Sequence, residues 1–221
     1  MAATAAVTET RILVFARAPE PGAAKTRLIP LLGAARAATL QRLLIDRALS
    51  TALAAGTGPV ELWCAPSAQH PQLLHCCERH GVTAVSQSDG DLGARMLHAA
   101  VAALAIGPRV IIIGTDSPAL TAADLRRAAD ALDRRHDAVL IPAEDGGYVL
   151  IGLNWWDTRL FTDIAWSTDQ VMATTRERLA ALNWKWLELP PLWDVDRPAD
   201  FERLAASDLI PDLDAHMNQS A

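Results

Sequence analysis

The most informative segment of the chain reads Val110-Ile111-Ile112-Ile113-Gly114-Thr115-Asp116-Ser117-Pro118, in which an apolar β-branched run leads directly into a carboxylate and a turn. Such a run is typical of a strand that is buried on both faces of a sheet. Ligands of α/β sheets bind outside the carboxyl ends of the strands, and Asp116 follows such an end. We therefore expect an α/β fold with a ligand site at Asp116.

Strands and helices are predicted to alternate along the whole chain. The predicted strands are residues 11–16, 60–65, 82–85, 109–114, 137–142, 148–153 and 184–189. The predicted helices are residues 33–55, 72–80, 92–105 and 121–135, with a capping box at Thr121 and Asp124, a further helix that ends at Leu182-Asn183 and a last helix that starts near Pro198. This order predicts a Rossmann-like, mixed but mostly parallel sheet with helices on both faces. The short return through Gly146-Gly147 predicts one antiparallel excursion.

The length of 221 residues fits one α/β domain. We expect residues 1–10 to be a disordered tail, because they contain no sustained apolar run, and residues 11–221 to form the domain. Six of the seven tryptophans lie beyond residue 150. This shift suggests a nucleotide half at about 11–120 and an acceptor half at about 121–221.

The composition argues against several classes of protein. A net charge of −6 disfavours a nucleic-acid partner, whose phosphates need a basic surface. No segment is long and apolar enough to span a bilayer, and the first ten residues lack the basic start of a signal peptide. Three cysteines, an odd number without the spaced pairs of a zinc site, favour a reducing compartment. We expect a cytoplasmic protein with no nucleic-acid or membrane partner.

A basic turn, residues 19–27, follows the first predicted strand. Lys25 and Arg27 lie two positions apart on this turn, where exposed N–H groups and two cations could wrap a polyphosphate. The turn lacks the spacing of a Walker loop, so by itself it is a weak signal. The alternative is that both side chains are solvated loop charges.

Carboxylates after predicted strands could hold a hard cation. Asp116 is a candidate ligand for Mg²⁺ or Mn²⁺, and Mg²⁺ needs only one or two protein carboxylates beside phosphates and water. Either Asp194 or Asp196 could supply the second carboxylate. The alternatives are an Asx turn for Asp116 and a helix-capping role for Asp196 ahead of Pro198.

Two glycine-containing turns could let the backbone approach a ligand closely. The first, Gly90-Asp91-Leu92-Gly93, begins a helix and could face a base or ribose, although glycines there are also common for turn geometry alone. The second, Asp145-Gly146-Gly147-Tyr148, could approach a ligand or could be an ordinary hairpin turn.

Six segments carry a resemblance to a known family. They are Phe15-Ala16-Arg17-Ala18-Pro19, Lys25-Thr26-Arg27-Leu28, Gly90-Asp91-Leu92-Gly93, Gly114-Thr115-Asp116-Ser117-Pro118, Asp145-Gly146-Gly147-Tyr148 and Asp194-Val195-Asp196-Arg197-Pro198-Ala199-Asp200. From about residue 11 to residue 204 the chain resembles a bacterial family of glycosyltransferase-A-like (GT-A-like) proteins of largely unassigned function, in the nucleotide-diphospho-sugar transferase superfamily. This family is near the phospholactate and molybdenum-cofactor guanylyltransferases.

The resemblance implies a GT-A fold with a Mg²⁺ or Mn²⁺ cofactor, held by Asp116 and Asp196. The resemblance and the motifs together predict three further groups of residues. The predicted catalytic residues are Lys25, Arg27, Asp116 and Asp145. The predicted nucleotide-binding residues are Phe15, Ala16, Arg17, Lys25, Arg27, Gly90, Asp91 and Gly93. The predicted acceptor-binding residues are Gly146, Gly147, Tyr148 and Asp194.

Three functions follow from these predictions. The first is nucleotidyl transfer from an NTP to a small phosphorylated or phosphonate acceptor, with release of pyrophosphate. The second is glycosyl transfer from an NDP-sugar, with Glu144 or Asp145 as a base. Two cations on the first turn fit a triphosphate better than a diphosphate, which favours the first. The third is a catalytically silent nucleotide-binding protein. The base, the sugar, the acceptor and the oligomeric state stay open.

Overall fold

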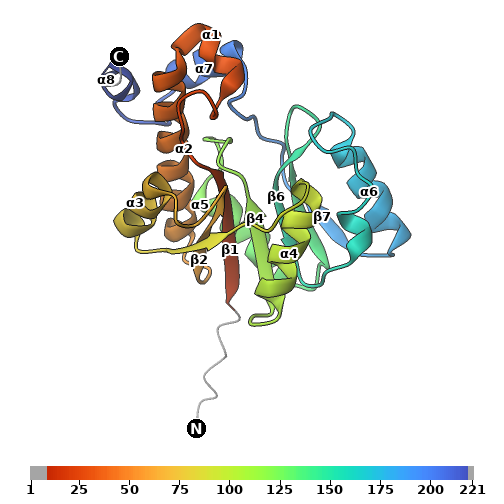
Figure 1. Ribbon diagram of the computed structural model, residues 1–221. Coiled ribbons are helices and arrows are strands. Elements are labelled where there is room, and N and C mark those ends of the chain that lie inside the picture. The colour runs from red at the N-terminus through yellow and green to blue at the C-terminus, as the bar shows by residue number, and fades with distance from the viewer. Residues whose placement is uncertain (1–8, 219–221) are drawn as a thin grey trace.

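The computed structural model describes residues 9–218, and its centre is one seven-stranded sheet (Figure 1). The strands are β1 (Thr10–Arg17), β2 (Val60–Ala65), β3 (Thr83–Ser86), β4 (Arg109–Ile113), β5 (Ala138–Pro142), β6 (Tyr148–Leu153) and β7 (Trp186–Glu188). Their order across the sheet is β3-β2-β1-β4-β6-β5-β7. All neighbours pair in parallel except β6, which is antiparallel to both β4 and β5. The predicted sheet, with its one antiparallel excursion, is therefore confirmed.

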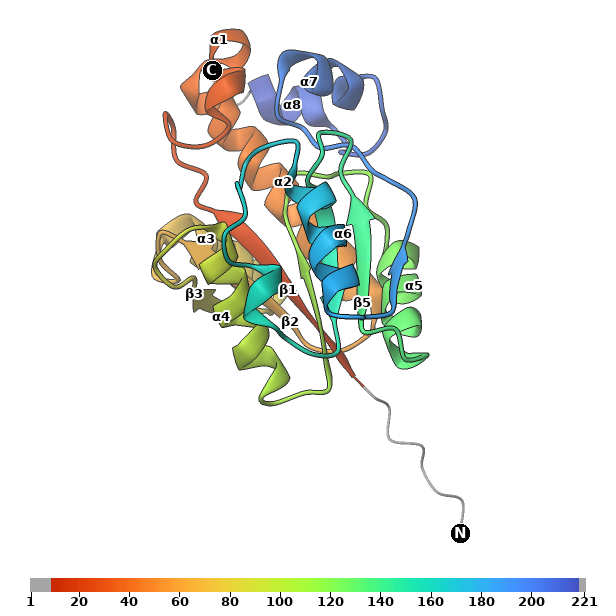
Figure 2. The same ribbon diagram turned by 90° about the vertical axis from the view of Figure 1, so that its right-hand side faces the viewer.

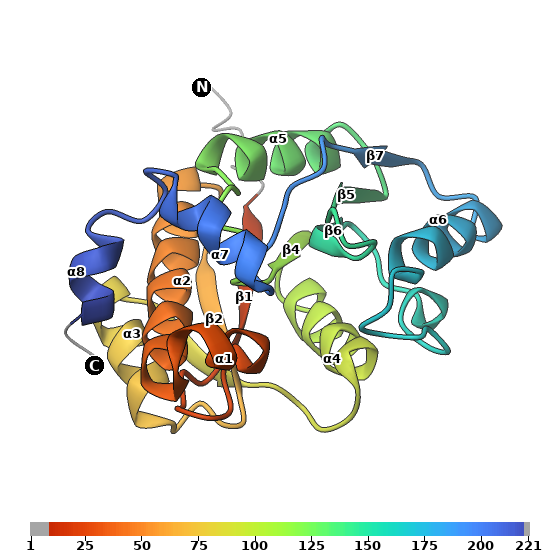
Figure 3. The ribbon, with the colours of Figure 1, turned by 90° about the horizontal axis from the view of Figure 1, so that it is seen from above.

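Helices cover both faces of this sheet. They are α1 (Ile29–Leu32), α2 (Ala34–Ala55), α3 (Pro71–His80), α4 (Leu92–Leu104), α5 (Ala122–Asp133), α6 (Val171–Ala181), α7 (Pro198–Ala205) and α8 (Leu213–Asn218), with short 3-10 turns η1 (Thr26–Leu28) and η2 (Thr158–Leu160). Seen from above, α2, α3 and α5 lie on one side of the sheet, and α4 and α6 lie on the other (Figure 3).

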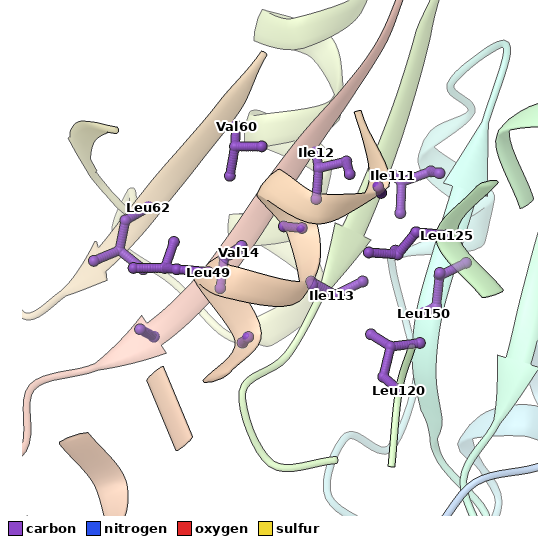
Figure 4. Close-up of a cluster of buried hydrophobic side chains, with 14 of the residues drawn as sticks. Ile12, Val14, Leu49, Val60, Leu62, Ile111, Ile113, Leu120, Leu125 and Leu150 are labelled. Atoms are coloured by element: carbon purple, nitrogen blue, oxygen red, sulfur yellow. The ribbon is translucent and has the colours of Figure 1, made fainter. Parts of the chain in front are cut away.

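Alternation along the central strands produces the two cores. Ile12 and Val14 of β1 point to the core under α2, α3 and α5, where Leu49 meets them (Figure 4). Leu13, between them, belongs to the opposite core under α4 and α6. Successive strand residues point to opposite faces, so a strand covered on both sides must be apolar throughout. This explains the uninterrupted apolar run from Val110 to Ile113 in β4, of which every residue is buried.

A third cluster of buried residues lies beyond the sheet, where α1, α7 and α8 gather around one end of α2 (Figure 2). Trp193 and Val195, from the segment that follows β7, are buried in this cluster. This segment is thereby held near the carboxyl ends of β1 and β4, where the candidate functional site lies.

The structure also corrects and extends the sequence predictions. The first strand begins at Thr10, which is buried, so the predicted tail over residues 1–10 is too long, and residues 1–8 lie outside the described part of the chain. The capping box of Thr121 and Asp124 is confirmed, as is Pro198 in the first turn of α7. The sequence predicted neither α1 nor α8. Within residues 9–218, no helix is long and apolar enough to cross a membrane.

Candidate functional site

A cavity of about 600 Å³ opens at the carboxyl ends of β1, β2 and β4. The chain runs from β1 to β2 and β3 on one side, and β4 lies on the other side of β1, so the cavity lies at the point where the strand order reverses. Ligands of open α/β sheets bind at such points. Most of the predicted site residues line the cavity: Phe15, Ala16, Arg17, Lys25, Arg27, Asp116, Asp145, Gly147, Tyr148, Asp194 and Asp196.

Lys25 is the most constrained of these residues. Its backbone has a left-handed conformation with φ 48°, and its side chain is only 4% exposed. The Nζ atom donates to the carbonyl oxygen of Val195 at 2.6 Å and lies 2.7 Å from Oδ1 of Asp116. The alternative of a solvated loop charge is therefore wrong for Lys25, because the side chain extends inward to the end of β4.

Arg27 forms the second cation–carboxylate pair at the cavity. Its guanidinium pairs with the carboxylate of Asp196, and both side chains stay accessible to solvent. Surface pairs of this kind contribute little to stability and can open at small cost. Both predicted phosphate-binding cations thus lie against the two predicted metal-binding carboxylates.

The carboxylate of Asp116 is oriented by a short hydrogen-bond chain. Gln41, a buried residue of α2, donates to Oγ1 of Thr115 at 3.3 Å and to the carbonyl oxygen of Arg17 at 3.4 Å. Thr115 in turn donates to Oδ1 of Asp116 at 3.2 Å. The carboxylate therefore contacts Lys25 and Thr115, in place of the Asx turn that was the alternative for Asp116.

The segment that follows β7 presents two carboxylates to the cavity. It is pinned to the Asp116 turn, because the N–H of Val195 donates to the carbonyl of Asp116 at 2.8 Å and Ser117 donates to the carbonyl of Trp193 at 2.7 Å. Trp193 and Val195 are buried, and the residues that alternate with them, Asp194 and Asp196, line the cavity.

The helix-capping alternative for Asp196 is wrong. The side chain of Asp200 accepts hydrogen bonds from the backbone N–H groups of both Asp196 and Arg197, at 3.1 and 2.7 Å. Asp200 therefore caps α7, and the carboxylate of Asp196 does not take part in capping.

Asp194 is the carboxylate whose environment is least favourable for a negative charge. The pKa of Asp194 is raised to about 6, first by burial and then by repulsion from the neighbouring carboxylates of Asp145 and Asp116, while Lys25 acts in the opposite direction. Repulsion between these carboxylates is relieved by a neighbouring cation, and Lys25 is such a cation here.

An Asp194→Asn variant is expected to be more stable than the wild-type protein at pH 7.5 and equally stable at pH 4, both in EDTA. In the unfolded chain, the carboxyl group of Asp194 ionises near its ordinary pKa, whereas in the folded protein it ionises near pH 6. The wild-type protein therefore loses stability as the pH rises from about 4, and the loss is complete above about pH 6. After allowance for solvent screening, the gain is about 1 to 2 kcal/mol, or several degrees in Tm. Thermal unfolding at both pH values measures this gain, and Asp130→Asn, at an exposed position of α5, is the control. An equal difference at both pH values would contradict the assignment.

The donor atoms fit a hard cation only in part. Within the described residues, no three His, Cys, Asp or Glu side chains are arranged to hold a metal ion. The carboxylates of Asp116, Asp194 and Asp196 all line the cavity, however, and oxygen ligands are those that Mg²⁺ and Mn²⁺ prefer. Because Mg²⁺ is commonly bound by one or two carboxylates plus phosphate oxygens, the residues fit an ion that is bound together with a phosphorylated ligand.

The first glycine turn contributes only Leu92 to the cavity lining, and Leu92 is not one of the residues predicted to bind the nucleotide. Contrary to prediction, Gly90, Asp91 and Gly93 are not among the lining residues. Asp91 caps α4 by accepting from the N–H of Ala94 at 2.8 Å. A Cβ atom on Gly93 would lie 2.1 Å from the carbonyl oxygen of Phe161, so this glycine allows close packing of α4. The alternative of turn and helix geometry accounts for all three residues.

The second glycine turn combines the two alternatives, a turn that approaches a ligand and an ordinary hairpin turn. Asp145, Gly147 and Tyr148 line the cavity, whereas Gly146 does not. Oδ1 of Asp145 accepts from the N–H of Gly147 at 2.9 Å, as in a simple hairpin turn. A Cβ atom on Gly146 would lie 2.3 Å from the carbonyl oxygen of Asp169, so Gly146 permits contact with the segment before α6. Burial raises the pKa of the Tyr148 phenol.

Several polar residues of the cavity were not predicted from the sequence. They are Thr26, Gln41, Gln87, Arg95, Thr115, Ser117, Ser167 and Thr168. A signal existed for Arg95, which lies in the first turn of the helix opened by the first glycine turn. The side chains of Ser167 and Thr168 follow no strand or motif, and nothing in the sequence marked them.

Comparison with known proteins gives a family and a fold. A family model described as "Uncharacterized protein conserved in bacteria (DUF2064)" matches residues 48–168. None of the curated proteins matches the chain.

Among solved structures, the chain is similar to a candidate nucleotide-diphospho-sugar transferase from Desulfovibrio desulfuricans G20, with 29% identity over 96% of this chain and 98% of that chain and a TM-score of 0.83. A nucleotidyl transferase from Methanothermobacter is 14% identical over 96% of this chain and 99% of that one, with a TM-score of 0.61. Glucosyl-3-phosphoglycerate synthase from Mycobacterium tuberculosis, in complex with Mn²⁺, UDP and glucosyl-3-phosphoglycerate, is 11% identical over 96% of this chain and 80% of that one, with a TM-score of 0.55. These similarities agree with the expected GT-A-like, Rossmann-like fold.

Proposed function

The chain belongs to the DUF2064 family, and from this premise we propose that it is a divalent-metal-dependent transferase of the nucleotide-diphospho-sugar transferase superfamily. In the proposed reaction, a nucleotidyl group is transferred from an NTP to a small phosphorylated or phosphonate acceptor. One observation carries the proposal. The buried ammonium of Lys25 lies 2.7 Å from the carboxylate of Asp116, at the carboxyl edge where β1 and β4 meet. The ammonium of Lys25 can bind a phosphate group, and the carboxylate of Asp116 can bind a metal ion. The two groups together are therefore suited to a polyphosphate that carries a metal ion.

In the proposed reaction, an oxygen of the acceptor attacks the α-phosphorus of the NTP, and the bond to the bridging oxygen of pyrophosphate breaks. Lys25 and Arg27 would bind the β- and γ-phosphates and stabilise the charge that the leaving pyrophosphate gains. Asp116 and Asp196 would hold the Mg²⁺ or Mn²⁺, which when bound would neutralise charge at the α-phosphate. For this to happen, each cation must leave its carboxylate partner and turn to phosphate.

Glycosyl transfer is a second candidate, and a specific observation favours it. A neighbouring cavity of about 470 Å³ shares Asp145, Asp194 and Asp196 with the main one and is also lined by Glu144, Asp169 and Asp200, so that its six carboxylates outnumber the two arginines of its lining, Arg27 and Arg197. Acidic walls repel a phosphorylated acceptor and can accept hydrogen bonds from the hydroxyl groups of a sugar.

If the reaction is glycosyl transfer, Asp145 is the better candidate for the base. Glu144 does not line the main cavity, and its carboxylate is paired with Arg203 at 2.9 Å. The side chain of Asp145 lines both cavities.

A thermal-shift panel tests the proposal. The purified protein would be scanned with Mg²⁺ and with Mn²⁺ against the four NTPs and against common UDP- and GDP-sugars, because a ligand that binds the native state raises Tm. We expect the largest shift with one NTP, followed by release of pyrophosphate when phosphorylated acceptors are added.

Each other outcome has a defined meaning. A larger shift with an NDP-sugar would replace nucleotidyl transfer by glycosyl transfer. Binding of a nucleotide without turnover of any acceptor would favour a catalytically silent nucleotide-binding protein. No shift with any nucleotide would contradict all three functions.

A further inference from the structure

Four cationic side chains line the cavity, and they differ in how their charge is balanced. Lys25 and Arg27 are each paired with a carboxylate. Arg17 and Arg95 also line the cavity, and neither forms an ion pair within the part of the chain that the structure describes. The cations that are free to bind an anion without first breaking an ion pair are therefore Arg17 and Arg95.

Arg95 differs from Arg17 in being held in a defined orientation. Its Nε atom donates to the carbonyl oxygen of Asp91 at 3.2 Å, and its Nη1 atom donates to Oε1 of Gln87 at 3.1 Å. The carboxylate of Asp91 is turned to the N–H of Ala94, so it caps the helix and does not pair with Arg95. A guanidinium has five N–H donors, and only part of them are used here. Arg95 is thus fixed by neutral acceptors and keeps both its charge and free donors.

Gln87 connects this arginine to the ends of two strands. Its Nε2 atom donates to the carbonyl oxygen of Trp63 at 2.8 Å and to that of Ala16 at 3.4 Å, and its backbone N–H donates to Cys64 at 3.0 Å. Because the amide nitrogen faces carbonyl groups, the amide oxygen is left to face Arg95. The position of the guanidinium is therefore set by the carboxyl ends of β1 and β2.

The charges of the cavity are unevenly distributed. Its carboxylates come from the end of β4 and from later segments, whereas Arg95 is bonded to Gln87, which follows β3 and itself donates to carbonyl groups of β1 and β2. We propose that Arg95 binds a phosphate group of the nucleotide and that Gln87 is its positioning residue, an inference that rests on the proposed nucleotide-dependent function. A preorganised guanidinium with an unbalanced charge and a planar array of donors is suited to phosphate.

The test measures the affinity of inorganic tripolyphosphate, with Mg²⁺, by titration calorimetry. Arg95→Gln is expected to weaken binding about tenfold to a hundredfold, because one charged hydrogen-bonding group is lost. Arg95→Lys keeps the positive charge and is expected to keep part of the affinity. Binding of the nucleoside of the preferred NTP and the Tm of the free protein are expected to stay unchanged. Arg134→Gln, at the exposed end of α5, is the matched control and is expected to bind tripolyphosphate like the wild-type protein.

Gln87 is tested through its dependence on Arg95. Gln87→Met is expected to weaken tripolyphosphate binding by less than Arg95→Gln does, and to add almost nothing in the Arg95→Gln background, because it acts through the same guanidinium. Additive losses would overturn the positioning role.

Failure of this inference and failure of the proposed function give different results. If the wild-type protein binds nucleotides and tripolyphosphate, and Arg95→Gln binds them equally well, only the role of Arg95 is overturned. An equal loss for nucleoside and tripolyphosphate would assign Arg95 to the base or to the fold, and would also overturn it. If the wild-type protein binds neither, the proposed function fails and the inference fails with it.

Discussion

An Asp116→Asn variant is expected to lose metal-dependent turnover by about a thousandfold or more, because removal of a metal-binding carboxylate costs several kcal/mol of transition-state stabilisation. Asparagine keeps the shape of the side chain and an oxygen that can accept from the ammonium of Lys25, 2.7 Å away. The buried lysine therefore retains a hydrogen-bond partner, and the fold is expected to survive. Turnover of the preferred nucleotide and its Mg²⁺ dependence are the quantities to measure.

The control for this variant is Asp130→Asn, which removes an exposed carboxylate of α5 away from the cavity and is expected to leave turnover unchanged. A Tm close to that of the wild-type protein would exclude unfolding as the cause of any loss. If Asp116→Asn kept its activity and its response to Mg²⁺, Asp116 would have no place in the metal site.

A Lys25→Met variant is expected to change the affinities for nucleotide and for metal in opposite directions. Binding of the preferred NTP with Mg²⁺ should weaken about tenfold to a hundredfold, because a charged contact to phosphate is lost. Binding of Mn²⁺ alone should become tighter, because the ammonium that competes for the carboxylate of Asp116 is gone. Methionine keeps the apolar stem of a side chain that is 4% exposed, so packing is largely preserved. Calorimetry with each ligand measures both effects.

The other lysine of the chain, Lys185, supplies the matched control. Its side chain is exposed and lies outside the cavity lining, so Lys185→Met is expected to change neither affinity. If Lys25→Met weakened metal and nucleotide alike, the exchange of partners between Lys25, Asp116 and phosphate would be wrong. Equal losses for an NTP and an NDP-sugar would count against nucleotidyl transfer in particular.

The parts of the site that could be predicted from the sequence are those set by local pattern. Asp116 was found because a buried strand ends directly before it, and the two turns around Lys25 and Asp145 were found because glycine and proline mark them. The pairing of Lys25 with the carbonyl of Val195 could not be found, because it joins residues 170 positions apart. No local pattern encodes such a contact.

The first glycine turn shows that a local pattern can also suggest a ligand site where a neighbouring segment packs. Gly90 and Gly93 look like a ligand-binding turn, yet the space beside Gly93 is filled by the backbone of Phe161 and the indole of Trp166. A glycine that admits a ligand and one that admits a neighbouring segment are alike in sequence. The residues of this helix that line the cavity are Leu92 and Arg95, in its first turn.

The hydrogen bonds at the Asp116 turn have a consequence for how the protein can vary. The chain departs from the carboxyl edge of β4 at Ser117 and returns to it at Trp193, and these two residues are joined by a hydrogen bond of 2.7 Å. Everything between them, including α5, β5, β6, α6 and β7, therefore starts and ends at one point. Insertions, deletions or exchanges within this stretch can therefore be accommodated while the departure and return points keep their places. Under the proposed function, this allows acceptor preference to change without change to the edge that holds Lys25 and Asp116.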